Sequence, residues 1–122
     1  MSFTKNIKGR NGEDEAAALL ANKGFNIIER NYRFGKGEID IIAEVNDELV
    51  FVEVKFRSSE SYGHPIYALS VSKQKQIIRV AKGYIYERNI VDKIIRFDAV
   101  TIYENSGSTE IEHIENAFSE YR

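Results

Sequence analysis

The sequence contains no cysteine and a single proline, Pro65, and none of its apolar runs is long. Without cysteine the chain can form neither a disulfide nor a thiolate zinc site, and the redox compartment is left undetermined. No run approaches the roughly 20 apolar residues that span a bilayer. Residues 1–10 also lack the apolar core of a signal peptide. We therefore expect a cytoplasmic protein without a membrane partner.

Neither sign of charge dominates the chain, which has 17 basic and 19 acidic side chains and a net charge of −2. This value alone argues against a nucleic-acid-binding protein. From Glu104 onward, however, there are five acids and one base, so residues 1–103 carry 16 basic and 14 acidic side chains. The charge distribution therefore permits nucleic-acid binding without supporting it.

The length of 122 residues fits one domain with a single core, which we expect to span residues 1–122. Periodicity and turn residues predict the order αβββαββ. The expected elements are a helix from an Asn11 N-cap to Lys23, a strand over 25–33, a hairpin over 37–57, a helix from a Ser72 N-cap to about Arg88, and strands over 94–103 and 110–114. Residues 1–10 and 115–122 are expected to be loose. This order predicts an α/β fold, with a central mixed five-stranded sheet flanked by helices.

The stretch Gly37–Arg57 predicts a hairpin whose strands are joined by a tight turn at Asn46 and Asp47. In both strands a purely apolar set of residues alternates with a set that contains the charges. Successive strand residues point to opposite faces, so one face is apolar and the other is charged. The charged residues are Glu38, Asp40, Glu44, Glu53, Lys55 and Arg57.

The turn also predicts the register of this hairpin. A two-residue turn, or a four-residue loop with the same register, places Asp40 opposite Glu53 and Glu38 opposite Lys55. Directly opposed side chains have Cβ atoms about 4.5–5.5 Å apart, and like charges there are destabilising. A three-residue loop would bury the charges and is disfavoured. The two carboxylates therefore need a compensating cation.

A divalent cation such as Mg²⁺ or Mn²⁺ would supply that charge, because such ions bind one or two carboxylates with waters and phosphate oxygens. Asp40 and Glu53 would be the carboxylate ligands, and the Val54 carbonyl could add an oxygen. Lys55 could position or deprotonate a water, or stabilise charge on a phosphate. The alternative is a surface salt-bridge cluster on a solvated sheet face. Apolar residues on the same face favour a covered surface with the charges at its edge. They are Ile42, Leu49 and Phe51.

Other residues could serve such a site. Glu13 approaches the carboxylates if the first helix covers the charged face; otherwise it is an acid favoured by the helix dipole. Basic residues of the second helix are candidates for phosphate contacts, with a solvated helix face as the alternative of equal weight. They are Lys73, Lys75, Arg79 and Lys82. The 13-residue loop Ser58–Ser70 could close over a substrate, with Tyr62 stacking on a base. His113 has no acid or metal partner in view.

Four motifs together resemble the YraN-like family, a bacterial group placed in the restriction-endonuclease-like PD-(D/E)XK superfamily near archaeal Holliday-junction resolvases. They are GEDxAA at Gly12–Ala17, GEIDIIA at Gly37–Ala43, FVEVKFR at Phe51–Arg57 and RFD at Arg96–Asp98. The resemblance covers nearly the whole chain up to Tyr103 and implies a restriction-endonuclease-like core. Ile39 replaces the superfamily proline before the aspartate, as is usual in this family.

The resemblance also implies roles for individual residues and a function. It implies Asp40 as the superfamily aspartate, Glu53 and Lys55 as the E-x-K pair, Glu13 as the acidic residue of the first helix and a further metal ligand, and Arg57, Ser58, Tyr62, Lys73 and Gln74 as nucleic-acid contacts. The leading hypothesis is a Mg²⁺- or Mn²⁺-dependent endonuclease that acts on DNA. A branched or junction DNA substrate and a homodimer follow only by analogy to resolvases, and RNA is the alternative nucleic-acid substrate. The alternatives are a nucleic-acid-binding module with little turnover and a structural or protein-interaction domain.

Overall fold

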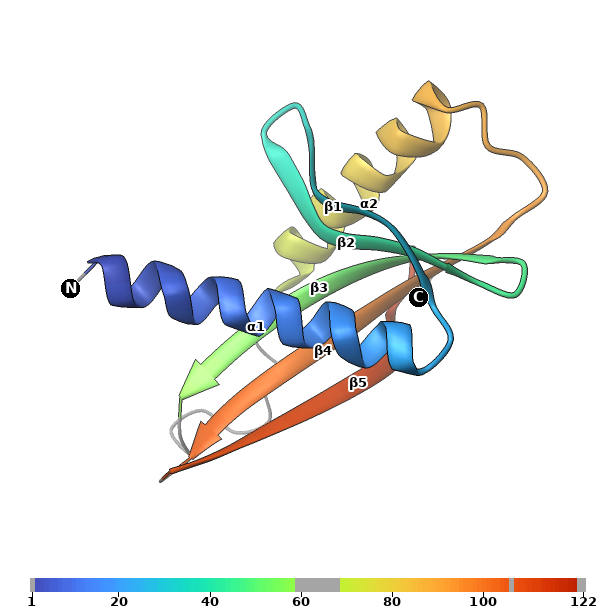
Figure 1. The fold of residues 1–122 in the computed structure, drawn as a ribbon. Helices are drawn as coiled ribbons and strands as arrows, with labels where there is room; N and C mark the ends of the chain where they lie inside the picture. Colours follow the sequence, from blue (N-terminus) through green and yellow to red (C-terminus); the bar gives the residue numbers. More distant parts are fainter. Residues whose placement is uncertain (1, 59–68, 106, 121–122) are drawn as a thin grey trace.

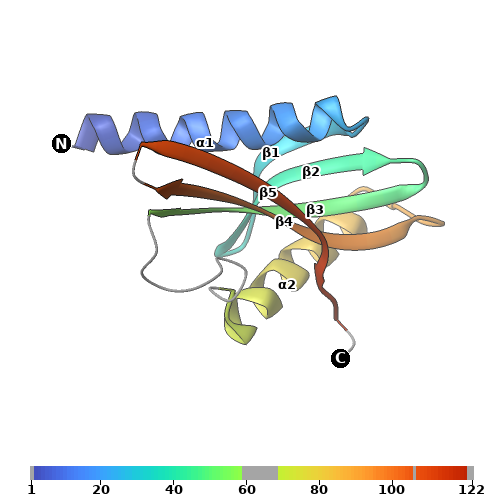
Figure 2. The ribbon, with the colours of Figure 1, turned by 90° about the horizontal axis from the view of Figure 1, so that it is seen from below.

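A computed structural model of the chain describes residues 2–58, 69–105 and 107–120, with side chains over 12–56, 69–104 and 107–120. Its centre is a twisted five-stranded sheet with one helix on each face (Figures 1 and 2). The elements in chain order are α1 Ser2–Asn22, β1 Asn26–Phe34, β2 Gly37–Val45, β3 Glu48–Ser58, α2 Val71–Glu87, β4 Ile94–Asn105 and β5 Ser108–Phe118. The predicted α/β class and the order αβββαββ are confirmed.

The sheet is mixed, as predicted, with the strand order β1-β2-β3-β4-β5. β3 and β4 are parallel because α2 connects them as a crossover, and the other neighbours are antiparallel. Within the described ranges, no helix is both long enough and apolar enough to cross a membrane.

Three predicted boundaries are wrong. α1 begins at Ser2, so Asn11 lies inside the helix and residues 2–10 are not a loose lead-in. α2 is capped by Ser70 rather than Ser72, because Ser70 has an extended backbone and its Oγ accepts a hydrogen bond from the Lys73 backbone N–H at 3.1 Å. β5 extends to Phe118, because the chain end returns to pair with β4 at Phe97.

Each face of the sheet has its own apolar core. α1 covers the face that the sequence predicts as purely apolar, and α2 covers the apolar part of the charged face (Figure 2). The core under α1 contains Ala16, Leu20, Phe25, Ile41, Ala43, Val50, Val52, Val100 and Ile102. The core under α2 contains Tyr32, Ile39, Ile42, Leu49, Phe51, Ile77, Val80, Ala81, Tyr84 and Phe97. The condition under which Glu13 would approach the carboxylates, namely that the first helix covers the charged face, is therefore not met.

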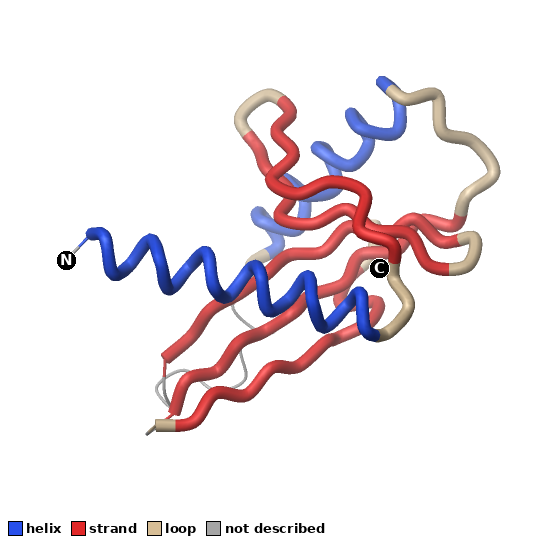
Figure 3. The backbone as a smooth tube through the Cα atoms, viewed as in Figure 1, coloured by secondary structure: helices blue, strands red, loops and turns tan. Residues whose placement is uncertain are grey.

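The hairpin of β1 and β2 changes face near Asp40. Ile41 packs in the core under α1, whereas Ile39 packs in the core under α2. Residues two apart on a regular strand would share a face. On β1, the opposing residue Asn31 has a left-handed backbone (φ 55°), which asparagine tolerates better than most residues. The tip of this hairpin therefore turns away from β3 and onto α2 (Figures 1 and 3).

The hairpin tip and α2 approach each other closely at Gly83. A Cβ atom at this position would lie 2.6 Å from the Phe34 ring. We expect Gly83→Ala to lower the free energy of unfolding by about 1–3 kcal/mol, as overpacking does, despite the better helix propensity of alanine. Urea denaturation of the two proteins measures this difference. An unchanged or higher stability would contradict the close packing of the tip on α2.

Candidate functional site

The predicted hairpin register is confirmed where β2 and β3 pair. Ile42 pairs with Phe51, and the strands are joined by the two-residue turn at Asn46 and Asp47. The paired residues end at Ile41 opposite Val52. The expected oppositions of Asp40 to Glu53 and of Glu38 to Lys55 are therefore not ladder pairs, because the β2 strand departs from β3 at this point.

Asp40 lies at the fork between the two strands. Its Oδ2 accepts a hydrogen bond from the Val54 backbone N–H at 2.8 Å. In a continued ladder that N–H would bond to the backbone of β2, so the Asp40 side chain takes the place of a backbone acceptor. The fork thus fixes the position of the carboxyl group from both strands.

Asp40 is a carboxyl group that ionises with difficulty. Partial burial, the largest cause, and the nearby charge of Glu53 together raise the pKa of Asp40 to about 8. The hydrogen bond from Val54 opposes this shift, and the charges of Glu13 and Glu38 add to it. At neutral pH, Asp40 therefore holds a proton that a bound cation would displace.

Glu53 is the more deeply buried carboxylate, with 7% of its surface exposed. Burial raises its pKa, and the charges of Lys73 and Lys55 and a hydrogen bond to Asp40 oppose the shift. The Lys73 Nζ lies 3.8 Å from Glu53 Oε2. Lys55 follows two residues later on the same strand and is partly buried. The structure thus brings Asp40, Glu53 and Lys55 together, and it adds Lys73 from α2.

Glu13 approaches the fork from the other face of the sheet. Its Oε1 lies 3.6 Å from the Arg30 Nη2, and Arg30 also binds Asp14 at 2.8 Å. The negative charge of Glu13 nevertheless raises the pKa of Asp40. Glu13 is therefore an electrostatic neighbour of the pair, and its own contact is with Arg30.

The two carboxyl groups of Asp40 and Glu53 are a small set of protein ligands that suits a hard divalent cation. Among the described residues, no group of three or more histidine, cysteine, aspartate or glutamate side chains could hold a metal ion. Asp40 and Glu53 offer two carboxylates, the number that Mg²⁺ commonly takes from a protein before waters and phosphates complete its coordination. Glu13 and the Val54 carbonyl remain predicted ligands.

The predicted nucleic-acid contacts on α2 have different surroundings. Lys75 and Arg79 are exposed, whereas Gln74 donates a hydrogen bond to the Leu69 carbonyl at 3.0 Å and helps to hold the start of the helix. Lys82 is exposed and pairs with Glu120. Arg57, Ser58 and Tyr62 were also predicted as contacts, and their side chains lie outside the described residues.

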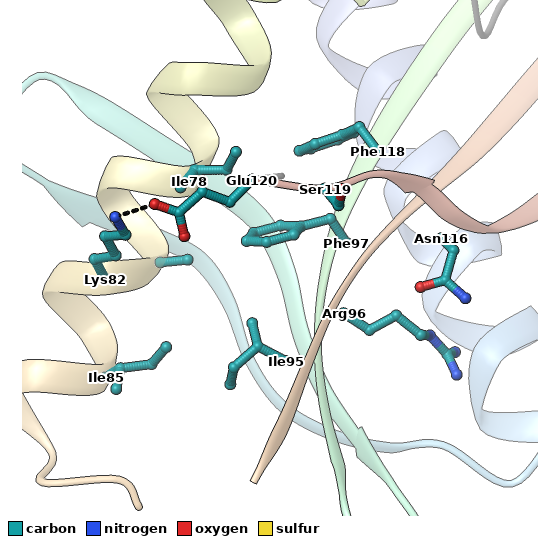
Figure 4. Close-up of a pocket in the computed structure, with 11 residues that line it drawn as sticks. Ile78, Lys82, Ile85, Ile95, Arg96, Phe97, Asn116, Phe118, Ser119 and Glu120 are labelled. Carbon is teal, nitrogen blue, oxygen red and sulfur yellow. Dashed lines mark hydrogen bonds and ion pairs between the residues drawn. The ribbon is translucent and has the colours of Figure 1, made fainter. Parts of the chain in front are cut away.

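A cavity of about 240 Å³ lies between α2 and the paired ends of β4 and β5, away from Asp40 and Glu53 (Figure 4). Its walls are mainly apolar, and the ion pair of Lys82 with Glu120 lies at one side. Its apolar walls include Ile78, Ala81, Ile85, Ile95, Phe97 and Phe118. No predicted carboxylate contributes to it.

A second charged cluster surrounds Asp98 and was missed from the sequence. The Asp98 carboxylate is fully buried and accepts two hydrogen bonds from the Arg96 guanidinium, both 2.9 Å long. The His113 Nε2 lies 2.7 Å from the same carboxylate, and the Asn116 N–H donates to it at 3.1 Å. The expectation that His113 lacks an acid partner is therefore wrong.

Hydrogen bonding decides the charge state of Asp98. Burial alone would raise its pKa, but the hydrogen bonds from His113, Arg96 and Asn116 outweigh burial and hold the pKa below the usual value. The RFD motif at Arg96–Asp98 was the signal that could have located this cluster. The cluster links β4 to β5 and, through Lys23 on His113 Nδ1 at 2.6 Å, to the end of α1.

Comparison with known proteins identifies relatives along almost the whole chain. Residues 12–102 match the model of a family described as "Uncharacterised protein family UPF0102". A UPF0102 protein of Desulforapulum autotrophicum is 48% identical over 118 residues, which cover 97% of this chain and 98% of the relative. A UPF0102 protein of Clostridioides difficile is 47% identical over 111 residues, which cover 91% of this chain and 96% of the relative. The chain therefore belongs to the UPF0102 family, the YraN-like group that its motifs resemble.

Proposed function

We propose that the protein is a metal-dependent nuclease of the PD-(D/E)XK type that cleaves DNA phosphodiesters. The observation that carries the proposal is the pair of carboxyl groups at the fork, Asp40 and Glu53, whose pKa values are both raised. Holding two such groups together in a partly buried place costs stability. A ligand that uses them explains why the fold keeps them.

The residues of the fork divide the chemistry among them. Asp40 is oriented by the Val54 N–H, and Glu53 is held against Lys73. A divalent cation bound to the two carboxylates would supply the positive charge that polarises a phosphodiester. Lys55, on the strand that carries Glu53, would orient the attacking water or accept its proton, as general bases do.

The exposed basic residues of α2 would bind the DNA backbone. Lys75 and Arg79 lie on the helix whose first turn brings Lys73 to Glu53, and both are exposed. Such contacts position a duplex without reading its sequence. A branched or four-way substrate, and a dimer that would act on it symmetrically, follow by analogy with resolvases and are part of the proposal.

A nucleic-acid-binding module with little turnover is the second candidate. The lack of a three-ligand metal group in the described part of the chain favours it. It predicts DNA binding that does not require an ionised pair at Asp40 and Glu53. The nuclease, by contrast, requires both carboxylates and Lys55.

Cleavage assays separate the two candidates. Linear, flapped and four-way-junction DNA, and RNA, are incubated with the protein in Mg²⁺ or Mn²⁺ and in EDTA. We expect metal-dependent cleavage that falls at least about 100-fold in Asp40→Asn and Lys55→Ala, the range typical of a lost acid–base group. Asp47→Asn, an exposed acid in the turn at the far end of the same hairpin, is the control and should retain cleavage.

Two results would overturn the nuclease proposal. One is cleavage that persists in purified Asp40→Asn, because it would then come from another group or a contaminant. The other is binding of these substrates without cleavage in either metal by the wild type, which would support the binding module instead.

A further inference from the structure

Glu53 is paired with a cation that comes from a different element. Within the described residues, its salt bridge is made by Lys73 of α2, at 3.8 Å, and not by Lys55 of its own strand. The Lys73 ammonium also donates a hydrogen bond to the Gln76 Oε1 at 3.3 Å. Two polar contacts, with Glu53 and with Gln76, thus position the Lys73 ammonium next to the carboxylate pair.

The local structure explains why Lys73 reaches this place. The Ser70 cap accepts a hydrogen bond from the Lys73 backbone N–H, which fixes the first turn of α2. Residues of α2 further along the helix, Ile77 and Val80, anchor it on the same sheet face as Glu53. The side chain of Lys73 is 35% exposed, whereas that of Glu53 is 8% exposed. The lysine therefore lies between the buried carboxylate and solvent.

We infer that Lys73 is a positioning residue which neutralises the carboxylate pair in the metal-free protein and turns to a substrate phosphate when a divalent cation takes its place on Glu53. This inference rests on the proposed function, because it assumes that the pair binds such a cation. An ammonium group and a divalent cation repel each other and compete for the same oxygen. The flexible four-carbon stem allows the ammonium to move to a phosphate without moving the helix.

This role predicts opposite effects of one substitution on two ligands. Replacing Lys73 by methionine keeps an apolar stem and removes the competing charge. We expect Lys73→Met to bind Mn²⁺ roughly tenfold more tightly than the wild type, since one local charge repulsion is lost. The same variant should bind junction DNA severalfold more weakly, because one phosphate contact is lost.

The test is a calorimetric titration with Mn²⁺ alone and, separately, a DNA-binding titration in EDTA. Lys75→Met is the matched control, since Lys75 is on the same helix, is exposed and should affect DNA binding but not Mn²⁺ binding. Lys73→Arg keeps the charge and should restore wild-type Mn²⁺ affinity. If Lys73 had a purely structural role, Lys73→Met would bind both Mn²⁺ and DNA more weakly. Urea denaturation of each variant identifies that case.

The outcomes separate this inference from the function on which it rests. If the wild type binds Mn²⁺ through Asp40 and Lys73→Met binds it no more tightly, the role of Lys73 is wrong and the metal site stands. If neither the wild type nor Lys73→Met binds Mn²⁺, the metal site and this inference both fail. Should Lys73→Met not fold, Lys73→Gln, which also removes the charge, replaces it with the same expected results.

Discussion

Asp40→Asn should raise the free energy of unfolding at pH 8 by up to about 5 kcal/mol while it abolishes metal binding. The pKa of Asp40 is about 8 in the folded protein, raised by burial and by the charge of Glu53. Its ordinary value in the unfolded chain is close to 4, and each unit of difference corresponds to about 1.4 kcal/mol. Asparagine resembles the protonated acid in shape, keeps an acceptor for the Val54 N–H and carries no ionisation cost.

The same shift predicts how stability depends on pH. A raised pKa means that, between about pH 4 and pH 8, the folded protein holds a proton which the unfolded chain has lost. The contribution of Asp40 to stability is therefore complete in acid and declines as the pH rises through that range. Because Glu53 titrates together with Asp40, the decline belongs to the pair. Asp40→Asn should show a flatter stability profile over this range.

Urea denaturation between pH 4.5 and 8.5, with and without Mn²⁺, measures both effects. Mn²⁺ should stabilise the wild type increasingly as the pH rises, because the metal binds only ionised carboxylates and displaces their proton. It should leave Asp40→Asn unchanged. Asp47→Asn, in the exposed turn at the far end of the hairpin from the fork, should follow the wild type. Equal stability of Asp40→Asn and wild type at pH 8 would contradict the buried, strained character of the pair.

The parts of the site that depend on local patterns could be predicted from the sequence. The turn at Asn46 and Asp47 determined the register of β2 and β3, because a two-residue loop permits one pairing. The alternation along the strands then assigned each residue to one face of the sheet. The buried face of α2 followed from its 3.6-residue periodicity. The relative positions of residues that are close in the sequence were thus predicted correctly.

The fork at Asp40 could not be predicted because it depends on a third strand. β2 leaves β3 opposite the left-handed residue Asn31 of β1, and the hairpin tip beyond that point packs on α2. Extending the register of two strands beyond Ile41 assumed a flat ribbon that the sheet does not have. The sequence also did not predict which face of the sheet α1 covers, because both faces of the central strands carry enough apolar residues to pack against a helix.

The Asp98 cluster was hidden by an irregularity in β5. Asp98 and His113 are 15 residues apart, and their contact depends on how the chain returns after the last turn. Between Ala99 and Phe97 the register of β5 shifts, so Asn116, with a left-handed backbone (φ 52°), turns its N–H to Asp98. A simple alternating strand contains no sign of that turn.

We expect Asp98→Asn to lower the free energy of unfolding at pH 7 by about 3–5 kcal/mol, the usual effect of removing one partner from a buried ion pair. The side chain of Arg96 is only 11% exposed, so its guanidinium would remain buried without its main acceptor. The amide has one acceptor oxygen where the carboxylate has two, and it offers donors to groups that already donate. The total free energy of unfolding of a domain of this size is about 5–15 kcal/mol, so this substitution would remove much of its stability.

The size of this effect should depend on pH in the opposite direction to that of Asp40. The pKa of Asp98 lies below its ordinary value, because its hydrogen bonds outweigh burial. Its contribution is therefore present at neutral pH and declines in acid, as the pH falls through the folded pKa. The difference in stability between wild type and Asp98→Asn should be largest near pH 7 and shrink below about pH 4, where the unfolded carboxyl group is protonated.

Urea denaturation at pH 7 and at the lowest pH where both proteins fold tests this expectation. The double variant Asp98→Asn with Arg96→Met removes both partners, and it should lose less than the sum of the two single changes, because no buried charge is left unpaired. Mn²⁺ affinity should be unchanged in any of these variants that fold, since the cluster shares no residue with the fork. A difference that does not depend on pH would mean that packing, rather than the charge on Asp98, holds β5 and the end of α1 to the sheet.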